Sequence, residues 1–283
     1  MKVSRLVLGT VQFGMNYGVA NTHGKPSYET VKDILRKALD NGITTLDTAA
    51  GYGDSEEVIG KALKDLGIQK EMTIVSKVEH VPADVDPAAF IEKSIRGSMQ
   101  RLQISVIPVM LMHTESDMRY LPELRSMIDK GLILDAGVSM DSLAYADRTH
   151  EISSLQVPCN VMDHRFDKVF TEKHNRIFIR SVYLQGMLLM AENAVPVPEL
   201  LPYRRKLEAF GMPMHELCMR YLFSLPGNVS VLTGVDTPEQ LEANAKMAAL
   251  GPLPADLYEK VASTVPLLSE DYIRPSNWAK RKK

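Results

Sequence analysis

Residues 42–53 read Gly-Ile-Thr-Thr-Leu-Asp-Thr-Ala-Ala-Gly-Tyr-Gly, an apolar run that ends at a carboxylate and is bounded by glycines. A short apolar run between turn residues is typical of a buried strand. The segments on either side have helical periodicity, and residues 27–41 place apolar side chains at spacings of three and one, with Ser27 as a plausible N-cap. Residues 55–66 repeat this scheme and end at Gly67. The stretch is therefore the strand of a helix–strand–helix unit.

The same rhythm extends in both directions along the chain. Eight apolar runs occur, near residues 6–9, 43–47, 73–76, 106–112, 132–138, 155–159, 177–182 and 229–233. Their continuous apolar character indicates strands buried on both faces, as in a parallel sheet. Amphipathic segments lie between the runs, so the sequence predicts an α/β fold, a (β/α)8 TIM barrel.

The predicted helices fill most of the gaps between strands and leave one domain over residues 1–283. They span residues 27–41, 55–66, 87–102, 120–130, 141–153, 213–223 and 238–250. The segment 160–176 has a weak helical pattern, and the longest connection covers residues 183–228. An extra helix and a tail are expected from about residue 254. Because the first strand begins almost at once, an N-terminal hairpin plug is expected to be absent or very short.

Composition limits the class of protein. The net charge is −2 with mixed signs, which argues against nucleic acid or a membrane surface as a partner. No apolar stretch is long enough to span a membrane, and no signal peptide is recognisable. The two cysteines, Cys159 and Cys218, provide neither a disulfide framework nor a metal site. A cytoplasmic protein without a bound metal is expected.

Four polar side chains stand at or just after successive strand ends. Asp47, Lys77 and His113 end the second, third and fourth apolar runs, and Tyr52 follows Asp47 by five residues. Since the carboxyl ends of parallel barrel strands meet at one rim, we expect the four side chains to lie close together. Each has an ordinary structural role when considered alone: a turn cap, a surface aromatic, a solvated lysine and a buried imidazole.

Together these groups would make a proton donor. A free tyrosine hydroxyl is a poor acid near neutral pH, and a neighbouring ammonium favours its phenolate form. Asp47 would hold Lys77 charged and oriented, while His113 would hydrogen-bond the same substrate oxygen or relay a proton. Such an acid suits an oxygen that becomes negative, as when a carbonyl receives hydride. Because side chains cannot donate hydride, a cofactor is required.

These motifs resemble those of the aldo/keto reductase superfamily. The resemblance rests on residues 42–53, Ser76-Lys77 and Leu111-Met112-His113, and it extends from Leu8 to Asn244. It implies that Asp47, Tyr52, Lys77 and His113 form a catalytic tetrad with Tyr52 as the acid. It also implies an NAD(P)H-dependent enzyme that reduces an aldehyde or ketone, a small-molecule carbonyl substrate, to an alcohol.

The resemblance further implies the residues that bind the cofactor, grouped by the part of the cofactor they contact. They are Gly9, Thr10, Gln12 and Asp47 near the nicotinamide, Ser139 and Gln156 at its carboxamide, Ser181, Gln185 and Gly186 around the pyrophosphate, and Asp236, Gln240 and Asn244 on the adenosine side. Met140 stands where the family usually has asparagine, and Asp236 stands where it usually has serine.

The second departure bears on the choice of cofactor. NADP(H) is the family default, but an aspartate would repel a 2′-phosphate and accept hydrogen bonds from a ribose diol, so NAD(H) is possible. Arg204 or Arg205 in the long connection could supply a 2′-phosphate site. Alternatively, Asp236 is simply the N-cap of the last barrel helix.

Two other functions remain open at this level. One is a catalytically weak regulatory or scaffold protein that binds a nicotinamide cofactor. The other is a lyase or isomerase that uses Lys77 as a Schiff-base amine, which an ion pair with Asp47 disfavours.

The segment from Gly9 to Asn21 resembles a bacterial subgroup linked to sugar metabolism. Monomer and homo-oligomer are both compatible with the sequence.

Overall fold

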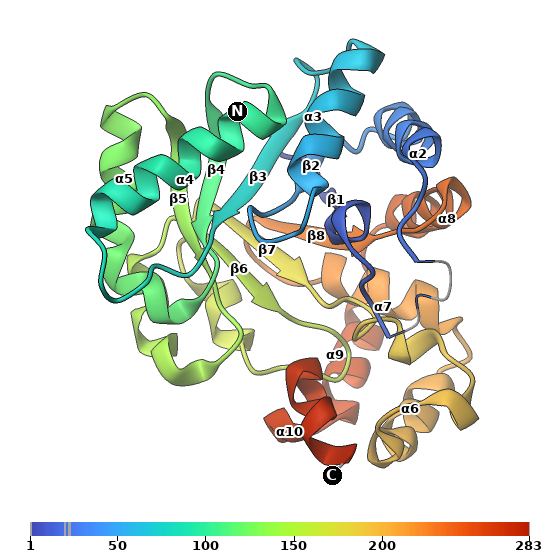
Figure 1. Ribbon diagram of the computed structural model, residues 1–283. Helices are drawn as coiled ribbons and strands as arrows, with labels where there is room; N and C mark the ends of the chain where they lie inside the picture. The colour runs from blue at the N-terminus through green and yellow to red at the C-terminus, as the bar shows by residue number, and fades with distance from the viewer. Residues whose placement is uncertain (1, 20, 22–23, 283) are drawn as a thin grey trace.

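Eight parallel strands close into a barrel in the order of the chain (Figure 1). The computed structural model describes residues 2–19, 21 and 24–282, and the side chains up to residue 278. The strands are β1 (Leu6–Gly9), β2 (Thr45–Asp47), β3 (Thr73–Val78), β4 (Ile107–Met112), β5 (Ile133–Ser139), β6 (Ser154–Pro158), β7 (Arg176–Arg180) and β8 (Val229–Gly234). β8 pairs with β1, with Leu6 opposite Val231, which closes the ring. The predicted (β/α)8 barrel is confirmed.

Helices surround the barrel and follow most of its strands. The α-helices are α1 (Val11–Gly14), α2 (Tyr28–Asp40), α3 (Ser55–Leu66), α4 (Pro87–Leu102), α5 (Leu121–Asp129), α6 (Leu201–Glu208), α7 (Met214–Phe223), α8 (Pro238–Ala249), α9 (Ala255–Thr264) and α10 (Glu270–Ile273). Short 3-10 segments are η1 (Glu115–Tyr120), η2 (Leu143–Glu151), η3 (Asp167–Thr171), η4 (Met187–Leu189), η5 (Glu192–Ala194), η6 (Pro198–Leu200) and η7 (Pro275–Lys282).

Local signals explain where several helices begin and end. The Ser27 hydroxyl accepts a hydrogen bond from the Thr30 amide at 3.1 Å, so it caps α2 as predicted. Gly67 ends α3 with a φ of 70°, a left-handed conformation that glycine adopts without strain. Asp86 caps α4 ahead of a proline in the first turn, where the missing N–H has no helical partner to lose.

Two segments differ from the prediction. The helix expected at 141–153 is wrong, because the chain there forms η2, which is kinked at Tyr145. Thr149 is the one buried residue of η2, so no apolar stripe holds the segment as an α-helix against the barrel. In contrast, α6 lies inside the long connection and was not predicted. Its Pro202 sits in the first turn, where proline is tolerated.

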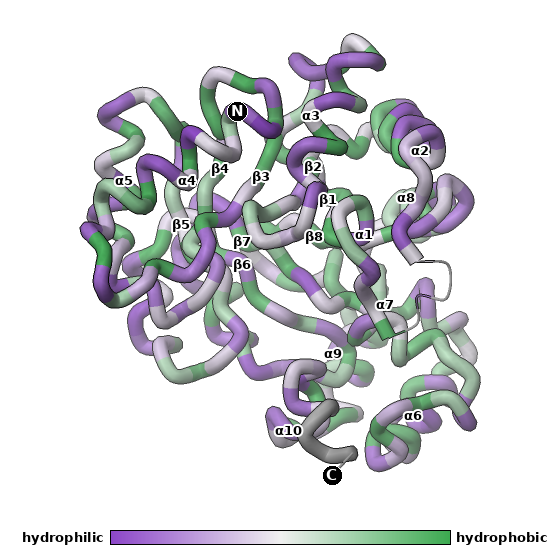
Figure 2. The backbone as a smooth tube through the Cα atoms, viewed as in Figure 1, coloured by the Kyte–Doolittle hydropathy of each residue, from purple (hydrophilic) through white to green (hydrophobic). Residues whose placement is uncertain are grey.

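The core has an inner and an outer part. The barrel interior is filled by six fully or nearly fully buried side chains, Val7, Val75, Val109, Leu111, Phe178 and Leu232. Val3, in the segment before β1, packs against this inner cluster, and residues 2–5 contain no strand. The larger cluster lies between strands and helices. Figure 2 shows the matching alternation of hydrophobic and hydrophilic residues along α2 and α5.

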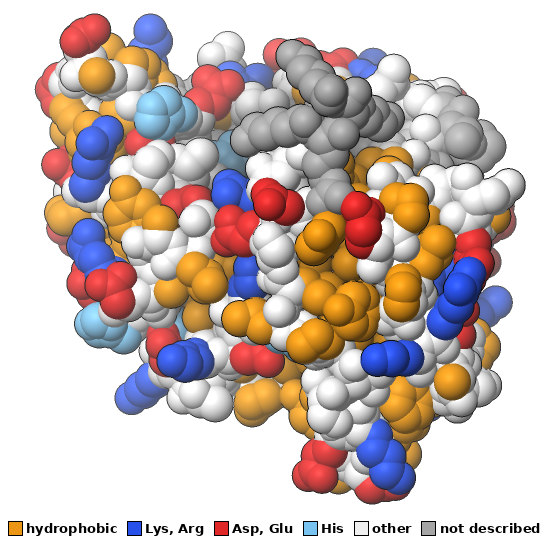
Figure 3. Space-filling view, turned by 90° about the horizontal axis from the view of Figure 1, so that it is seen from below, with side chains coloured by type: hydrophobic (Ala, Val, Ile, Leu, Met, Phe, Trp, Pro, Cys, Tyr) orange, Lys and Arg blue, Asp and Glu red, His pale blue; other side chains and the backbone are white. Residues whose placement is uncertain are grey.

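The face of the molecule seen in Figure 3 shows no large field of one sign. Acidic and basic side chains are interspersed over the face seen in Figure 3, as the net charge of −2 suggests. In the part of the chain that the structure describes, no helix combines the length and the apolar character that crossing a membrane requires.

Candidate active site

The four residues predicted at strand ends lie together at the carboxyl-terminal rim of the barrel. Lys77 Nζ donates hydrogen bonds of 2.7 Å to Asp47 Oδ1 and 2.7 Å to the Thr48 carbonyl. Both partners of this ion pair are buried, with side-chain exposures of 0% and 5%. The Tyr52 ring centroid is 4.9 Å from Lys77 Nζ, and the His113 ring meets it edge-on at 5.5 Å. The predicted cluster therefore exists as a geometric unit.

Close backbone packing holds the loop that carries Tyr52. A Cβ atom on Gly14, the last residue of α1, would lie 1.8 Å from the Tyr52 carbonyl oxygen, so only glycine fits there. Below this contact the hydroxyl of Ser55 donates to the Thr10 carbonyl at 2.9 Å and lies 3.0 Å from the Thr48 hydroxyl. The loop is thus attached to β1, β2 and α3 at once, which restricts the movement of Tyr52.

The charge states of two members follow from their surroundings. Burial alone would lower the pKa of Lys77, but the Asp47 carboxylate and Tyr52 outweigh it, and the pKa is raised. Lys77 is therefore an ammonium near neutral pH. Burial, with help from the positive charges of Lys77 and Arg180, lowers the pKa of His113 from 6.5 to about 3. His113 is a neutral imidazole that can donate one hydrogen bond and accept another.

Asp47 is held from a second side by residues of the far barrel wall. Gln156 Nε2 donates to Asp47 Oδ2 at 2.7 Å, and Ser139 Oγ donates to Gln156 Oε1 at 3.2 Å. The two residues expected at a nicotinamide carboxamide therefore form a chain of hydrogen bonds that ends on the ion pair with Lys77. Both oxygens of the buried carboxylate have partners, which removes much of the cost of burying it.

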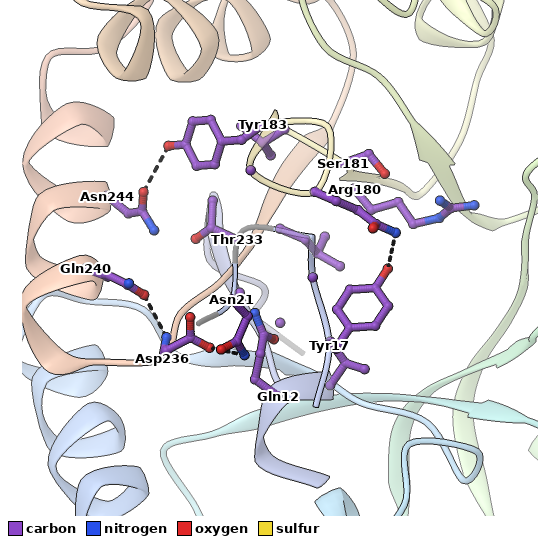
Figure 4. Close-up of a pocket in the computed structure, with 18 of the residues that line it drawn as sticks. Gln12, Tyr17, Asn21, Arg180, Ser181, Tyr183, Thr233, Asp236, Gln240 and Asn244 are labelled. Atoms are coloured by element: carbon purple, nitrogen blue, oxygen red, sulfur yellow. Dashed lines mark hydrogen bonds between the residues drawn. The ribbon is translucent and has the colours of Figure 1, made fainter. Parts of the chain in front are cut away.

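A cavity of about 560 Å³ opens beside the tetrad, a size in the usual range for small-molecule sites (Figure 4). Its lining contains most of the predicted residues, namely Gly9, Thr10, Gln12, Asp47, Tyr52, Gln156, Ser181, Gln185, Gly186, Asp236, Gln240 and Asn244. Lys77, His113 and Ser139 do not line it. Lys77 hydrogen-bonds Asp47, and Ser139 hydrogen-bonds Gln156, so each contacts a residue that lines the cavity. The His113 ring contacts the ring of Tyr52, which also lines it.

Several lining residues were not predicted. Tyr183 donates its hydroxyl hydrogen to Asn244 Oδ1 at 2.9 Å, and His215 Nε2 lies 2.8 Å from the same oxygen. Tyr17 accepts a hydrogen bond from Gln185 Nε2 at 3.2 Å. Tyr183 falls inside the loop already singled out, so its position in the sequence offered a signal. Asn21 ends the segment from Gly9 that was singled out in the sequence, whereas His215 of α7, Arg180 and Thr233 line the cavity without a motif that marks them.

The loop after β7 has an unusual backbone. Ser181, Leu184 and Gln185 have φ values of 65°, 49° and 53°, in the left-handed region that non-glycine residues rarely adopt, and Gly186 follows at 88°. Three such residues within five positions store strain, and strain of this kind clusters at binding sites. The conformation turns Ser181, Gln185 and Gly186 toward the cavity, which all three line.

The opposite end of the cavity lies at the start of α8. Asp236 Oδ1 accepts a hydrogen bond from Asn21 Nδ2 at 3.1 Å, and the Asp236 amide donates to Gln240 Oε1 at 2.7 Å (Figure 4). Thr237 caps α8, so the alternative role of Asp236 as the N-cap is wrong. Ala20, Thr22 and His23 of the neighbouring loop lie outside the described residues.

The two arginines considered for a 2′-phosphate have other partners. Arg204 Nε donates to Glu208 at 2.8 Å, and Arg205 pairs with Glu192 at 2.7 Å. Neither arginine lines the cavity. The suggestion that they complete a cofactor phosphate site is therefore not supported by their position.

Two orphaned atoms indicate that the cavity suits a polar ligand. Gln12 Oε1 and Thr233 Oγ1 are buried and have no hydrogen-bond partner among the described residues, although buried polar atoms nearly always have one. Both residues line the cavity. A Cβ on Gly234 would come within 2.4 Å of Gln12 Nε2, so the glycine leaves room for that amide. These residues fit the amides and hydroxyls of a dinucleotide.

Comparisons with known proteins agree with this geometry. The sequence profile of the Aldo/keto reductase family matches residues 5–265. An uncharacterized oxidoreductase of Mycobacterium tuberculosis is 32% identical over 87% of this chain and 85% of its own length. Aldo-keto reductase YhdN of Bacillus subtilis is 27% identical over 86% of this chain and 84% of its own.

A solved structure gives the same fold. The holo form of aldo-keto reductase AKR11C1 from Bacillus halodurans superposes with a TM-score of 0.76 over 97% of this chain and 96% of that one, at 20% identity. The fold and the rim of polar strand ends define a barrel oxidoreductase. The chain belongs to the aldo/keto reductase family and is an oxidoreductase of that kind.

Proposed function

We propose that this enzyme reduces an aldehyde or ketone to an alcohol, with Tyr52 as the general acid. One observation carries the proposal: the buried ion pair of Asp47 and Lys77 lies directly behind a tyrosine that lines a ligand-sized cavity. This is the arrangement needed to supply a proton to an oxygen that gains negative charge.

The chemistry assigns a task to each side chain. When bound, a nicotinamide cofactor would supply hydride to the carbonyl carbon, and the cofactor would itself be oxidised. Tyr52 gives its phenolic proton to the carbonyl oxygen as that oxygen takes the electron pair of the C=O π bond. The Lys77 ammonium stabilises the phenolate that remains, which then regains a proton from solvent. His113, as a neutral imidazole, donates a hydrogen bond to the same oxygen.

The surroundings of Asp236 bear on which cofactor binds. We infer that NADH binds more tightly than NADPH, the reverse of the family default. The Asp236 carboxylate lines the cavity at the N-terminal end of α8, where it would repel a 2′-phosphate. Among the described residues that line the cavity, Arg180 and His215 are the basic ones, and Arg180 is close enough to the tetrad to act on His113.

A calorimetric titration with NADH and with NADPH, followed by a screen of aldehydes and ketones, tests the proposal. We expect Tyr52→Phe to keep the cofactor Kd within about twofold and to lose about 10²- to 10⁴-fold in turnover. Turnover within threefold of the wild type would remove Tyr52 from its role. Absence of binding to either nucleotide would overturn the oxidoreductase mechanism.

The same experiments separate the rival functions. A regulatory or scaffold protein would bind cofactor tightly and turn over no carbonyl compound at a useful rate. A Schiff-base enzyme would be trapped covalently on Lys77 by borohydride together with its substrate. The short hydrogen bonds that Lys77 makes to Asp47 and Thr48 disfavour the second of these, since a Schiff base needs a free amine.

A further inference from the structure

Arg180 is a cation that the proposed mechanism does not use. It is the last residue of β7, and its side chain lines the same cavity as Asp47 and Tyr52. The side chain is 28% exposed, so it is neither sealed in the core nor free in solvent. A partly buried arginine facing a ligand cavity is a strong candidate for contact with an anion.

Neighbouring groups hold the guanidinium in place from one side. Its Nη2 donates to the Met140 carbonyl at 2.9 Å and to Asp141 Oδ1 at 2.8 Å. Asp141 in turn accepts from Arg274, just beyond α10, so two arginines share one carboxylate. The Nε and Nη1 donors of Arg180 have no acceptor among the described residues. The guanidinium of Arg180 is therefore preorganised, and it retains N–H donors that a ligand could use.

The distribution of charge along the cavity favours an anion at this point. The charged side chains of the lining are Asp47, Arg180 and Asp236, and Asp47 is neutralised by Lys77. Asp141, the counter-ion of Arg180, is not among the lining residues. Arg180 therefore lines the cavity, whereas the carboxylate that anchors it does not.

The charge of Arg180 acts at the end of the cavity where the tetrad lies. Arg180 Nη2 donates to the carbonyl of Met140, the residue after Ser139, and Ser139 begins the chain of hydrogen bonds that runs through Gln156 to Asp47. Its positive charge also helps to lower the pKa of His113, after burial and Lys77. Asp236 marks the other end of the cavity, at α8. An anion bound to Arg180 would accordingly lie near the reacting carbonyl.

We propose that Arg180 determines substrate specificity and that the carbonyl substrate carries a carboxylate that pairs with it. This inference rests on the proposed function, because it places a substrate group beside Tyr52. A carboxylate suits the site better than a phosphate, since a single arginine already shared with Asp141 offers too little positive charge for a dianion. Loss of such a charge-assisted contact typically costs about tenfold to a hundredfold in kcat/KM.

The test compares matched pairs of substrates. Each of 2-, 3- and 4-carboxybenzaldehyde is assayed beside its methyl ester, which differs only in charge and one methyl group. We expect the wild type to prefer at least one acid over its ester by tenfold or more in kcat/KM, mainly through KM. In Arg180→Met that ratio falls to about one, and Arg180→Lys recovers part of it.

Two controls complete the design. Arg176→Met changes an arginine at the opposite end of the same strand, whose Nη1 donates to Ser230, and it should leave the acid-to-ester ratio unchanged. Calorimetry of the hydroxymethylbenzoate isomer that is formed from the preferred acid should show binding to the wild type with cofactor present and at least tenfold weaker binding to Arg180→Met.

The outcomes distinguish two kinds of failure. Equal rates on acid and ester in the wild type, or an unchanged ratio in Arg180→Met, overturn the inference and leave the carbonyl reductase intact. Weaker cofactor binding in Arg180→Met, with equal loss on acid and ester, assigns the guanidinium to the cofactor and also overturns it. Absence of turnover on both members of every pair overturns the proposed function and the inference together.

Discussion

The two ends of the cavity are built differently. At the tetrad end, Asp47 and Lys77 are buried on neighbouring strands and every oxygen of the carboxylate has a partner. At the Asp236 end, the groups come from the start of α8 and from the loop containing Asn21, and they are partly exposed.

The contrast suits two different tasks, proton transfer at the tetrad end and ligand recognition at the Asp236 end. A proton donor needs its neighbours within a few tenths of an ångström, and strands of a closed barrel provide that rigidity. A cofactor must enter and leave, so its contacts belong on loops and at a helix terminus. Changes at the first end should therefore damage stability and rate together, whereas changes at the second should alter only affinity and preference.

The largest effect is expected from Lys77→Met. Removal of the ammonium leaves Asp47 buried without its ion partner, which should reduce the free energy of unfolding by about 3–5 kcal/mol. Turnover should fall by about 10²- to 10⁴-fold. Urea denaturation and steady-state assays measure the two losses.

The double variant Asp47→Asn/Lys77→Met sharpens this result. It removes both charges, so it should be more stable than Lys77→Met alone. Lys130→Met is the matched control, because its ion pair with Glu92 is exposed and should contribute far less than the buried pair. Equal losses for the buried and the exposed pair would contradict the proposed contrast between the two ends.

A smaller effect is expected from Gly14→Ala. The new methyl group would collide with the Tyr52 carbonyl, so the loop must shift, at a cost of about 1–3 kcal/mol and a lower turnover. Gly97→Ala on α4 is the control, since the three atoms nearest its added carbon belong to the Arg101 guanidinium, at 3.2 Å or more, and none is a backbone atom. Thermal melts and turnover are measured for both. A fully active, fully stable Gly14→Ala would show that the contact does not position Tyr52.

Asp236→Ser tests the other end of the cavity. Removal of the carboxylate should improve NADPH binding relative to NADH by about tenfold, through the loss of charge repulsion. The melting temperature should hardly change, because the side chain is partly exposed. Glu239→Gln, which lies outside the cavity lining, should leave the ratio of the two Kd values as it was. If Asp236→Ser leaves the ratio of the NADPH and NADH Kd values unchanged, this aspartate does not determine which cofactor binds.

A separate prediction concerns pH, and its effect on stability accumulates with each unit of acidification. His113 is neutral in the folded protein down to a pKa of about 3, whereas in the unfolded chain it takes up a proton below about 6.5. Acidification between these values therefore favours unfolding, by at most about 1.4 kcal/mol per pH unit. His113→Gln lacks this contribution and should lose less stability from pH 6.5 to pH 4 than the wild type. His150→Gln, at an exposed site, should behave as the wild type does.

Much of the fold could be read from local pattern. The eight apolar runs predict the barrel because strands buried on both faces need continuous apolar side chains, and the observed strands lie within two residues of those runs. The prediction failed at η2, where an α-helix had been expected over 141–153, and at α6, which had not been expected. Their conformations depend on what packs against them, which no local spacing reveals.

The position of Asp47, Tyr52, Lys77 and His113 was also determined by the sequence, since the strand ends of a parallel barrel must share a rim. The tertiary structure alone decided which of these line the cavity and what holds them. Gln156 reaches Asp47 from 109 residues away, and Arg180 and His215 face the cavity from β7 and α7. Such pairings depend on the closure of the barrel, because only closure brings opposite walls within hydrogen-bonding distance.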